Sequence, residues 1–195
     1  MVKIIGLTGG IGSGKTTIIN YIQSKGFPVY IADDAGKEVM EYPDIIKKIN
    51  ALFNGEVLLP NGFLNRTKIA SIVFKDKELL YQLNKIVHPA VALHFKDFVE
   101  KNASSDIIFK ESAILFESEA YKKCDATILI TAPLNIRIHR VMLRDQVTED
   151  DVLKRVKNQM TDSEKQKLAT FIVENIKLNE TFKNIDQIIS KILIN

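Results

Sequence analysis

The chain has 195 residues, of which 46% are hydrophobic and 26% charged, as in soluble globular domains and unlike disordered or fibrous proteins. Its formal net charge of +3 arises from mixed acidic and basic residues, so nucleic acid is not an expected partner. The single cysteine, Cys124, excludes an internal disulfide and a multi-cysteine zinc site, and neither a signal peptide nor a membrane span is apparent, so we expect a cytoplasmic protein with an ordinary thiol.

The N-terminal part has a strand, loop and helix pattern. A β-branched run at 3–7 predicts a strand, a glycine-rich segment follows it, and apolar residues then recur at helical spacing from Lys15 to Lys25. Gly26 fits the left-handed position that often follows a helix, and residues 28–31 predict a second strand.

The middle of the chain is predicted to be mainly helical. This pattern runs from Ala35 to Val99, with turn signals at Pro43, 54–55 and 60–62. It predicts a helical insertion after the second strand.

The remaining elements alternate between strands and helices. Residues 107–109 and 127–130 are short apolar runs, typical of strands buried on both faces of a parallel sheet, and 171–173 predicts a last strand. Helices are expected at 134–143, from an N-cap at Thr148 to about Met160, and over 184–193. This alternation predicts an α/β fold with a doubly wound parallel sheet.

The strongest motif is Gly9-Gly10-Ile11-Gly12-Ser13-Gly14-Lys15-Thr16, which satisfies the GxxxxGK[ST] pattern of the phosphate-binding loop, or P-loop. Because the motif follows a predicted strand and opens a predicted helix, its backbone N–H groups can converge on a phosphate chain. Lys15 offers positive charge to the outer phosphates, Thr16 offers a hydroxyl to Mg²⁺, and Thr17 is close enough to assist at an inner phosphate. A glycine-rich turn that contains Lys-Thr by chance is the minor alternative.

The segment from Gly6 to Thr17 resembles the N-terminus of the dephospho-coenzyme A kinase family, and the resemblance continues in order over roughly residues 3 to 190. Its further elements are Asp33, Leu64-Asn65-Arg66, Val87-His88-Pro89, Ala113-Ile114-Leu115-Phe116-Glu117, Arg140, Arg144-Asp145, Gln159 and Asn175. The sequence departs from the family pattern at Ile31, at Ala113 and at Ile176-Lys177.

The resemblance implies an ATP-dependent kinase that phosphorylates the ribose 3′-hydroxyl of dephospho-coenzyme A, with ATP and Mg²⁺ as cofactors. It implies a single kinase unit that works as a monomer or weak homo-oligomer, with a core like that of nucleoside monophosphate kinases. The expected parts are a nucleotide-binding core at about 1–33, 104–136 and 163–195, a helical substrate-binding insertion at about 34–103, and a helical lid at about 137–162.

The resemblance also implies the site residues. It implies that the catalytic residues are Asp33, Lys15 and Arg140. ATP binding falls to Gly10, Gly12, Ser13, Gly14, Lys15, Thr16, Thr17, Arg140, Arg144 and Asn175. Substrate binding falls to Thr8, Asp33, Arg66, His88, Leu115 and Glu117, and metal binding to Thr16 and, through water, Glu111.

Two acidic residues also make chemical sense without the family. Asp33 lies just past the carboxyl end of a predicted strand, where sheets of this kind bind ligands, so it is placed to orient an acceptor hydroxyl and accept its proton. It could instead be a helix N-cap, and Asp34 competes for either role. Glu111 follows the 107–109 run and either holds Mg²⁺ through water or is a solvated residue at a strand end.

Three arginines, Arg137, Arg140 and Arg144, have spacings that place the first two, and then the last two, on one helical face. They form either a solvated basic stripe or a lid in which Arg140 and Arg144 neutralise developing charge on ATP, with Asp145 orienting Arg144. His88 is either a core or turn residue or, by the resemblance, a substrate contact.

Other functions leave different signals. A GTPase switch requires an Asn-Lys-x-Asp segment, and the nearest match, residues 84–87, lacks the Asp. A non-catalytic nucleotide-binding module should lack acceptor-side acids and lid arginines. Nucleoside, nucleoside monophosphate and shikimate kinases share the core and stay open as alternatives on sequence physics alone.

Overall fold

The computed structural model describes residues 2–194. The chain divides into two compact units: a sheet unit, made of the residues up to Ile31 and from Asn102 onward, and a helical unit, Ala32–Lys101. Within residues 2–194, no helix is both long enough and apolar enough to span a membrane.

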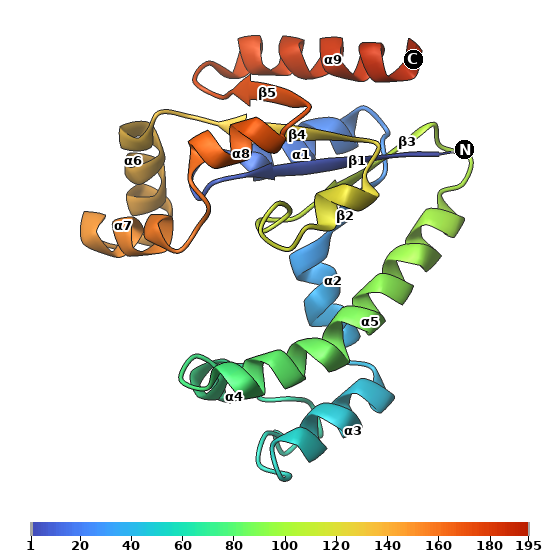
Figure 1. Ribbon diagram of the computed structural model, residues 1–195, viewed down its shortest axis with the longest axis vertical. Helices are drawn as coiled ribbons and strands as arrows, with labels where there is room; N and C mark the ends of the chain where they lie inside the picture. Colours follow the sequence, from blue (N-terminus) through green and yellow to red (C-terminus); the bar gives the residue numbers. More distant parts are fainter. Residues whose placement is uncertain (1, 195) are drawn as a thin grey trace. The chain divides into compact units, whose positions relative to one another are not determined.

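The sheet unit is built on five parallel strands, which confirms the α/β doubly wound prediction (Figure 1). The strands are β1 (Lys3–Gly9), β2 (Val29–Ile31), β3 (Ile107–Glu111), β4 (Ala126–Thr131) and β5 (Phe171–Glu174), in the order β2-β3-β1-β4-β5. Because all neighbouring strands are parallel, their carboxyl ends meet at one edge of the sheet. The segment after β1 therefore lies where sheets of this class bind ligands.

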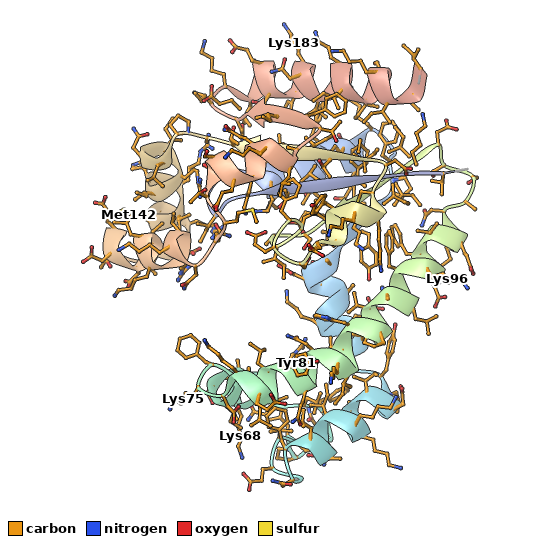
Figure 2. The ribbon with its side chains drawn as sticks, viewed as in Figure 1. Lys68, Lys75, Tyr81, Lys96, Met142 and Lys183 are labelled. Atoms are coloured by element: carbon orange, nitrogen blue, oxygen red, sulfur yellow. The ribbon has the colours of Figure 1, made fainter. Side chains whose placement is uncertain are left out.

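Two helices, α1 (Lys15–Ser24) and α9 (Leu178–Ile194), share one hydrophobic core with the sheet. Tyr21 and Phe182 stack where these helices meet, with ring centroids 4.0 Å apart. Lys183 points away from the sheet on the outer side of α9 (Figure 2). Gly26 follows the end of α1 with φ at 87°, as predicted from the sequence.

The C-terminal part of the sheet unit departs from the prediction in one place. The helix expected from Thr148 to about Met160 is α7 (Glu149–Lys157), and a separate helix, α8 (Asp162–Leu168), follows it. Thr148 is the predicted N-cap and forms a capping box, but Thr161 forms a second capping box and so begins a new helix. The helix before them, α6 (Leu134–Asp145), ends where Gln146 adopts a left-handed conformation.

Cys124 lies between a short 3-10 helix, η1 (Ala120–Lys123), and β4. Its thiol is partly buried and donates a weak hydrogen bond to the Ala120 carbonyl, with an S···O distance of 3.7 Å. Burial raises the pKa of this thiol, and nearby Lys110 only partly offsets the effect. Cys124 is therefore the ordinary thiol that the sequence predicted.

The helical unit contains α2 (Ala32–Val39), α3 (Pro43–Leu52), α4 (Arg66–Val73) and α5 (Lys77–Lys101), in agreement with the helical pattern predicted for this region. The other three helices pack on α5. Its core includes Ile49, Val57, Ile69 and Leu83. The unit thus has a hydrophobic core of its own.

Candidate active site

The P-loop joins β1 to α1 at the carboxyl edge of the sheet. Gly14 is the residue before α1 and has φ at 90°, and a Cβ there would also collide with the side-chain amide of Asn175. No side chain caps the start of α1, and the uncapped N-terminus of a helix favours an anion such as the phosphates of a nucleotide.

Polar groups inside the loop also fit a phosphate ligand. The hydroxyls of Ser13 and Thr8 are buried and, within the part of the chain that the structure describes, have no hydrogen-bond partner. Buried hydroxyls in native proteins are nearly always hydrogen-bonded, so these two fit the polar atoms of a bound ligand. The Lys15 ammonium folds back on the loop and donates to the Gly9 carbonyl at 2.7 Å.

Arg140 and Asn175 come from distant parts of the sequence and meet at the P-loop. The Asn175 side chain donates to the Ser13 carbonyl at 2.8 Å, and Arg140 donates to the Asn175 carbonyl at 3.0 Å. A second guanidinium nitrogen of Arg140 is buried and, among residues 2–194, lacks a hydrogen-bond partner. The structure thus gathers these two predicted residues with Ser13 and Gly14 around one loop.

Arg144 lies one turn further along α6 and is 62% exposed at its side chain. It donates to both carboxylate oxygens of Asp145, at 2.7 and 3.1 Å, which confirms the predicted contact between them. Arg155 of α7 also donates to Asp145 at 2.7 Å. Arg144 and then Arg155 lower the Asp145 pKa to about 2, so the carboxylate stays charged and holds Arg144.

Arg137 does not belong to a solvated stripe, which corrects one of the sequence alternatives. Only 4% of the residue is exposed. Its Nε donates to the Ile11 carbonyl at 2.8 Å, and its Nη1 pairs with Asp162 at 2.6 Å. Of the three arginines on α6, Arg137 is thus committed to contacts within the protein.

Glu111 is the last residue of β3, opposite Leu7 of β1, and is only 6% exposed. The alternative of a solvated glutamate is therefore wrong. Among residues 2–194 no cluster of three or more His, Cys, Asp or Glu side chains forms a metal site. Mg²⁺ in phosphotransferases usually takes one or two protein ligands beside phosphate oxygens and water, so Thr16 and Glu111 fit such a cation.

Two predicted substrate residues lie in the segment after β3. Leu115 is fully buried and packs against Gly6, and its carbonyl accepts a hydrogen bond from the Tyr121 N–H at 3.2 Å, so its side chain is closed to a ligand in this structure. Glu117 pairs with the fully buried Lys165 at 2.9 Å and accepts a hydrogen bond from the Met160 N–H at 3.1 Å. Burial alone raises the Glu117 pKa, but Lys165 outweighs it, so the pKa lies below its usual value.

The first turn of α2 carries both acidic residues that the sequence singled out. Asp33 is exposed, and its neighbour Asp34 forms an exposed ion pair with Lys37 at 2.7 Å. Both residues face solvent, and since α2 begins at Ala32, the alternative that Asp33 is the N-cap is wrong.

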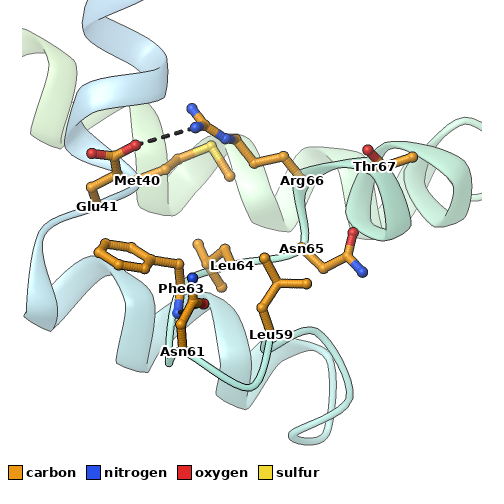
Figure 3. Close-up of a pocket in the computed structure, with 9 residues that line it drawn as sticks. All are labelled: Met40, Glu41, Leu59, Asn61, Phe63, Leu64, Asn65, Arg66 and Thr67. Carbon is orange, nitrogen blue, oxygen red and sulfur yellow. Dashed lines mark hydrogen bonds and ion pairs between the residues drawn. The ribbon is translucent and has the colours of Figure 1, made fainter.

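Arg66 borders a pocket of about 490 Å³ in the helical unit. Figure 3 shows Arg66 next to Met40, with an ion pair to Glu41 at 3.2 Å, and Leu59 and Phe63 also line the pocket. The pocket lining thus mixes apolar side chains with polar and charged ones.

His88 lies inside α5, directly before Pro89, and is exposed. It is neither a core nor a turn histidine, so that alternative is wrong. The long helix continues past Pro89 and leaves the imidazole on its surface.

The family model for dephospho-CoA kinase matches residues 3–180. The chain belongs to the dephospho-CoA kinase family. A curated dephospho-CoA kinase from Fusobacterium nucleatum is 36% identical over 187 residues, which cover 95% of this chain and 96% of that protein. The fold agrees: a Thermus thermophilus crystal structure has a TM-score of 0.89 at 33% identity, covering 97% of both chains. Dephospho-CoA kinase from Campylobacter jejuni has a TM-score of 0.73 at 26% identity and 98% coverage of both chains.

The family resemblance identified Gln159 only as a residue near the end of the lid. In this dephospho-CoA kinase family member, the Gln159 side chain accepts a hydrogen bond from the Ile11 N–H at 2.9 Å. Asp162 and Lys165, which pair with Arg137 and Glu117, were not identified from the sequence at all. The signal that could have drawn attention to them is the Thr161 to Glu164 capping box, which marks a helix start next to Asp162.

Proposed function

We propose that the protein transfers the terminal phosphoryl group of ATP to the ribose 3′-hydroxyl of dephospho-coenzyme A, giving coenzyme A and ADP. The observation that carries the proposal is the P-loop, where Gly14, Arg140 and Asn175 meet around uncapped N–H groups in a chain of this family. We place the reaction in the cytoplasm, with the protein as a monomer or weak homo-oligomer.

On the donor side, the backbone of the loop and the start of α1 hold the phosphates of ATP. The Lys15 ammonium leaves the Gly9 carbonyl and turns to the outer phosphates. The buried Ser13 hydroxyl and the open guanidinium nitrogen of Arg140 gain the partners that they lack, and Asn175 keeps the loop in shape. Gly10, Gly12 and Thr17 complete the cradle.

Thr16 and Glu111 are the residues that hold Mg²⁺, Glu111 through water. Mg²⁺ held by these residues would supply positive charge that neutralises the outer phosphates. The buried position of Glu111 keeps its carboxylate close to the sheet edge rather than in bulk solvent.

On the acceptor side, Asp33 orients the 3′-hydroxyl and accepts its proton. It follows the carboxyl end of β2 by two residues. Arg66, beside its pocket, contacts the pyrophosphate and pantetheine part, and His88 adds a further contact. Thr8, the Leu115 backbone and Glu117 form the remainder of the substrate site.

The segment at about 137–162 acts as a lid over ATP, while residues at about 34–103 bind the substrate. Arg144, held by Asp145, and Arg140 supply the positive charge that the transition state requires. Closure excludes water and so favours transfer to the acceptor over hydrolysis.

The test is an ADP-release assay with ATP, Mg²⁺ and a panel of acceptors: dephospho-coenzyme A, nucleosides, nucleoside monophosphates and shikimate. Turnover should occur with dephospho-coenzyme A. Asp33→Asn should lower kcat by roughly 10²-fold or more with little change in ATP affinity, because it removes a general base. Asp34→Asn is the matched control and should retain activity, since Asp34 only pairs with Lys37 in solvent.

Lys15→Ala should abolish turnover. Turnover of another acceptor without dephospho-coenzyme A turnover would overturn the proposed substrate. A larger loss for Asp34→Asn than for Asp33→Asn would overturn the assigned base.

A further inference from the structure

Ile11 lies at the tip of the P-loop, and both its backbone polar groups are bound by side chains from far along the sequence. Its N–H donates to Gln159 Oε1 at 2.9 Å, and its carbonyl accepts from Arg137 Nε at 2.8 Å. Backbone groups of loops more often bond to neighbouring backbone or to water. The tip of this loop is instead held by the side chains of Gln159 and Arg137.

Arg137 is itself held in place. Its side chain is 5% exposed, and its Nη1 pairs with Asp162 Oδ2 at 2.6 Å. A Cβ on Gly10 would collide with the Arg137 guanidinium, and a Cβ on Gly12 would collide with the Arg137 carbonyl. The two glycines thus allow α6 to lie directly against the loop.

The three side chains come from the two ends of one stretch of chain. Arg137 lies in the first turns of α6, whereas Gln159 and Asp162 lie between α7 and the start of α8. Between them lie Arg140 and Arg144. The base of the lid segment is therefore joined to the P-loop by two side-chain hydrogen bonds to Ile11, and the ion pair between Arg137 and Asp162 ties the two ends of that base together.

We propose that Arg137, Gln159 and Asp162 are positioning residues that hold the P-loop in its phosphate-binding conformation and do not themselves touch the nucleotide. A loop with four glycines in six residues loses much conformational entropy when it is ordered. Fixing its tip in advance reduces the part of that cost which falls on ligand binding. This inference rests on the proposed function only in that the loop binds nucleoside di- and triphosphates.

The role makes a prediction that general destabilisation does not. The loop backbone cradles the α- and β-phosphates and its lysine reaches the β- and γ-phosphates, so loosening the loop should weaken binding of ADP and ATP much more than binding of AMP, which lacks the β-phosphate. A variant that merely unfolds more easily should lose affinity for all three nucleotides alike.

Two variants remove one contact each while keeping side-chain volume. Gln159→Met deletes the acceptor for the Ile11 N–H. Arg137→Lys can keep the ion pair with Asp162 but loses the Nε bond to Ile11. Asp186→Asn is the matched control, because Asp186 also accepts from a cation of another helix, Lys25, at 3.2 Å, and lies away from the loop.

The measurements are calorimetric titrations of the full chain with ADP and with AMP, together with thermal unfolding midpoints. We expect the ADP Kd to rise about tenfold in Gln159→Met and in Arg137→Lys, the size expected for one lost hydrogen bond at about 1.4 kcal/mol. AMP affinity should change less than about twofold, and Asp186→Asn should bind both nucleotides normally. Since both variants act on Ile11, the double variant should lose less than the product of the two single effects.

An unchanged ADP Kd in both variants, or equal losses for ADP and AMP, would overturn the positioning role. No acceptor is present in these titrations, so failure of dephospho-coenzyme A turnover overturns the proposed function without affecting this inference. Absence of ADP binding by the unaltered protein would overturn both.

Discussion

The ion pair between Lys165 and Glu117 is buried unevenly, and this predicts unequal costs for removing its two members. The Lys165 side chain is 0% exposed and the Glu117 side chain is 23% exposed, with Nζ and Oε1 2.9 Å apart. Glu117→Gln leaves an ammonium group without its counter-charge in a place that water does not reach. Breaking a buried pair in this way costs about 3 kcal/mol or more.

Lys165→Met should cost less. The remaining carboxylate is partly in water and keeps the hydrogen bond from the Met160 N–H at 3.1 Å, so we expect a loss of about 1 kcal/mol. The double variant, Glu117→Gln with Lys165→Met, should recover most of the stability that Glu117→Gln loses, because no buried charge is left unpaired.

The assay is urea unfolding followed by circular dichroism, with the free energy of unfolding extrapolated to water. Glu180→Gln is the control, since its pair with Lys177 is 67% exposed on the Glu180 side, and it should change that free energy far less. If Lys165→Met proved as costly as Glu117→Gln, or the double variant were the least stable of the three, the reasoning from burial would be refuted.

Two further predictions concern charge and backbone. Because Arg144 and Arg155 hold the Asp145 pKa at about 2, below its ordinary value of 3.8, the stability that Asp145 contributes is present above that ordinary value and lost as the pH falls toward 2. Unfolding curves of the parent and Asp145→Asn should therefore converge between about pH 4 and pH 2, and a constant gap would contradict the assignment. Gly14→Ala should abolish measurable ADP binding, whereas Gly26→Ala, with a similar φ of 87° but open space around its Cβ, should keep it and lose only about 1 kcal/mol of stability. Equal ADP affinity in the two glycine variants would show that the contact with Asn175 is unimportant.

The P-loop could be predicted from the sequence because its signal is local. Its glycines, Lys15 and Thr16 lie together in a short segment between a strand and a helix, and the glycines allow the backbone conformations that a phosphate-binding turn requires. The strands could be predicted as well, since runs such as 107–109 and 128–130 are continuously apolar, as is typical of strands buried in a parallel sheet.

The sequence does not predict helix α8, because the burial pattern of this helix is unusual. In the sequence DSEKQKL the buried residue is Lys165, so no apolar residues recur at helical spacing. The capping box from Thr161 to Glu164 was the available signal.

The role of Arg137 was hidden for another reason. Helical spacing placed it correctly on α6, but its partner Ile11 lies 126 residues away, and no local pattern encodes such a contact.

The single cysteine of the chain offers a way to observe opening of the sheet unit. Burial keeps the Cys124 thiol protonated and partly shielded, so a maleimide should react with it slowly while β1 and β4 stay in place. Its labelling rate then reports how often this region opens, in native buffer and without a second engineered thiol. Measuring the labelling rate of Cys124 with and without ADP would show whether nucleotide binding at the loop after β1 changes how often the opposite end of the sheet opens.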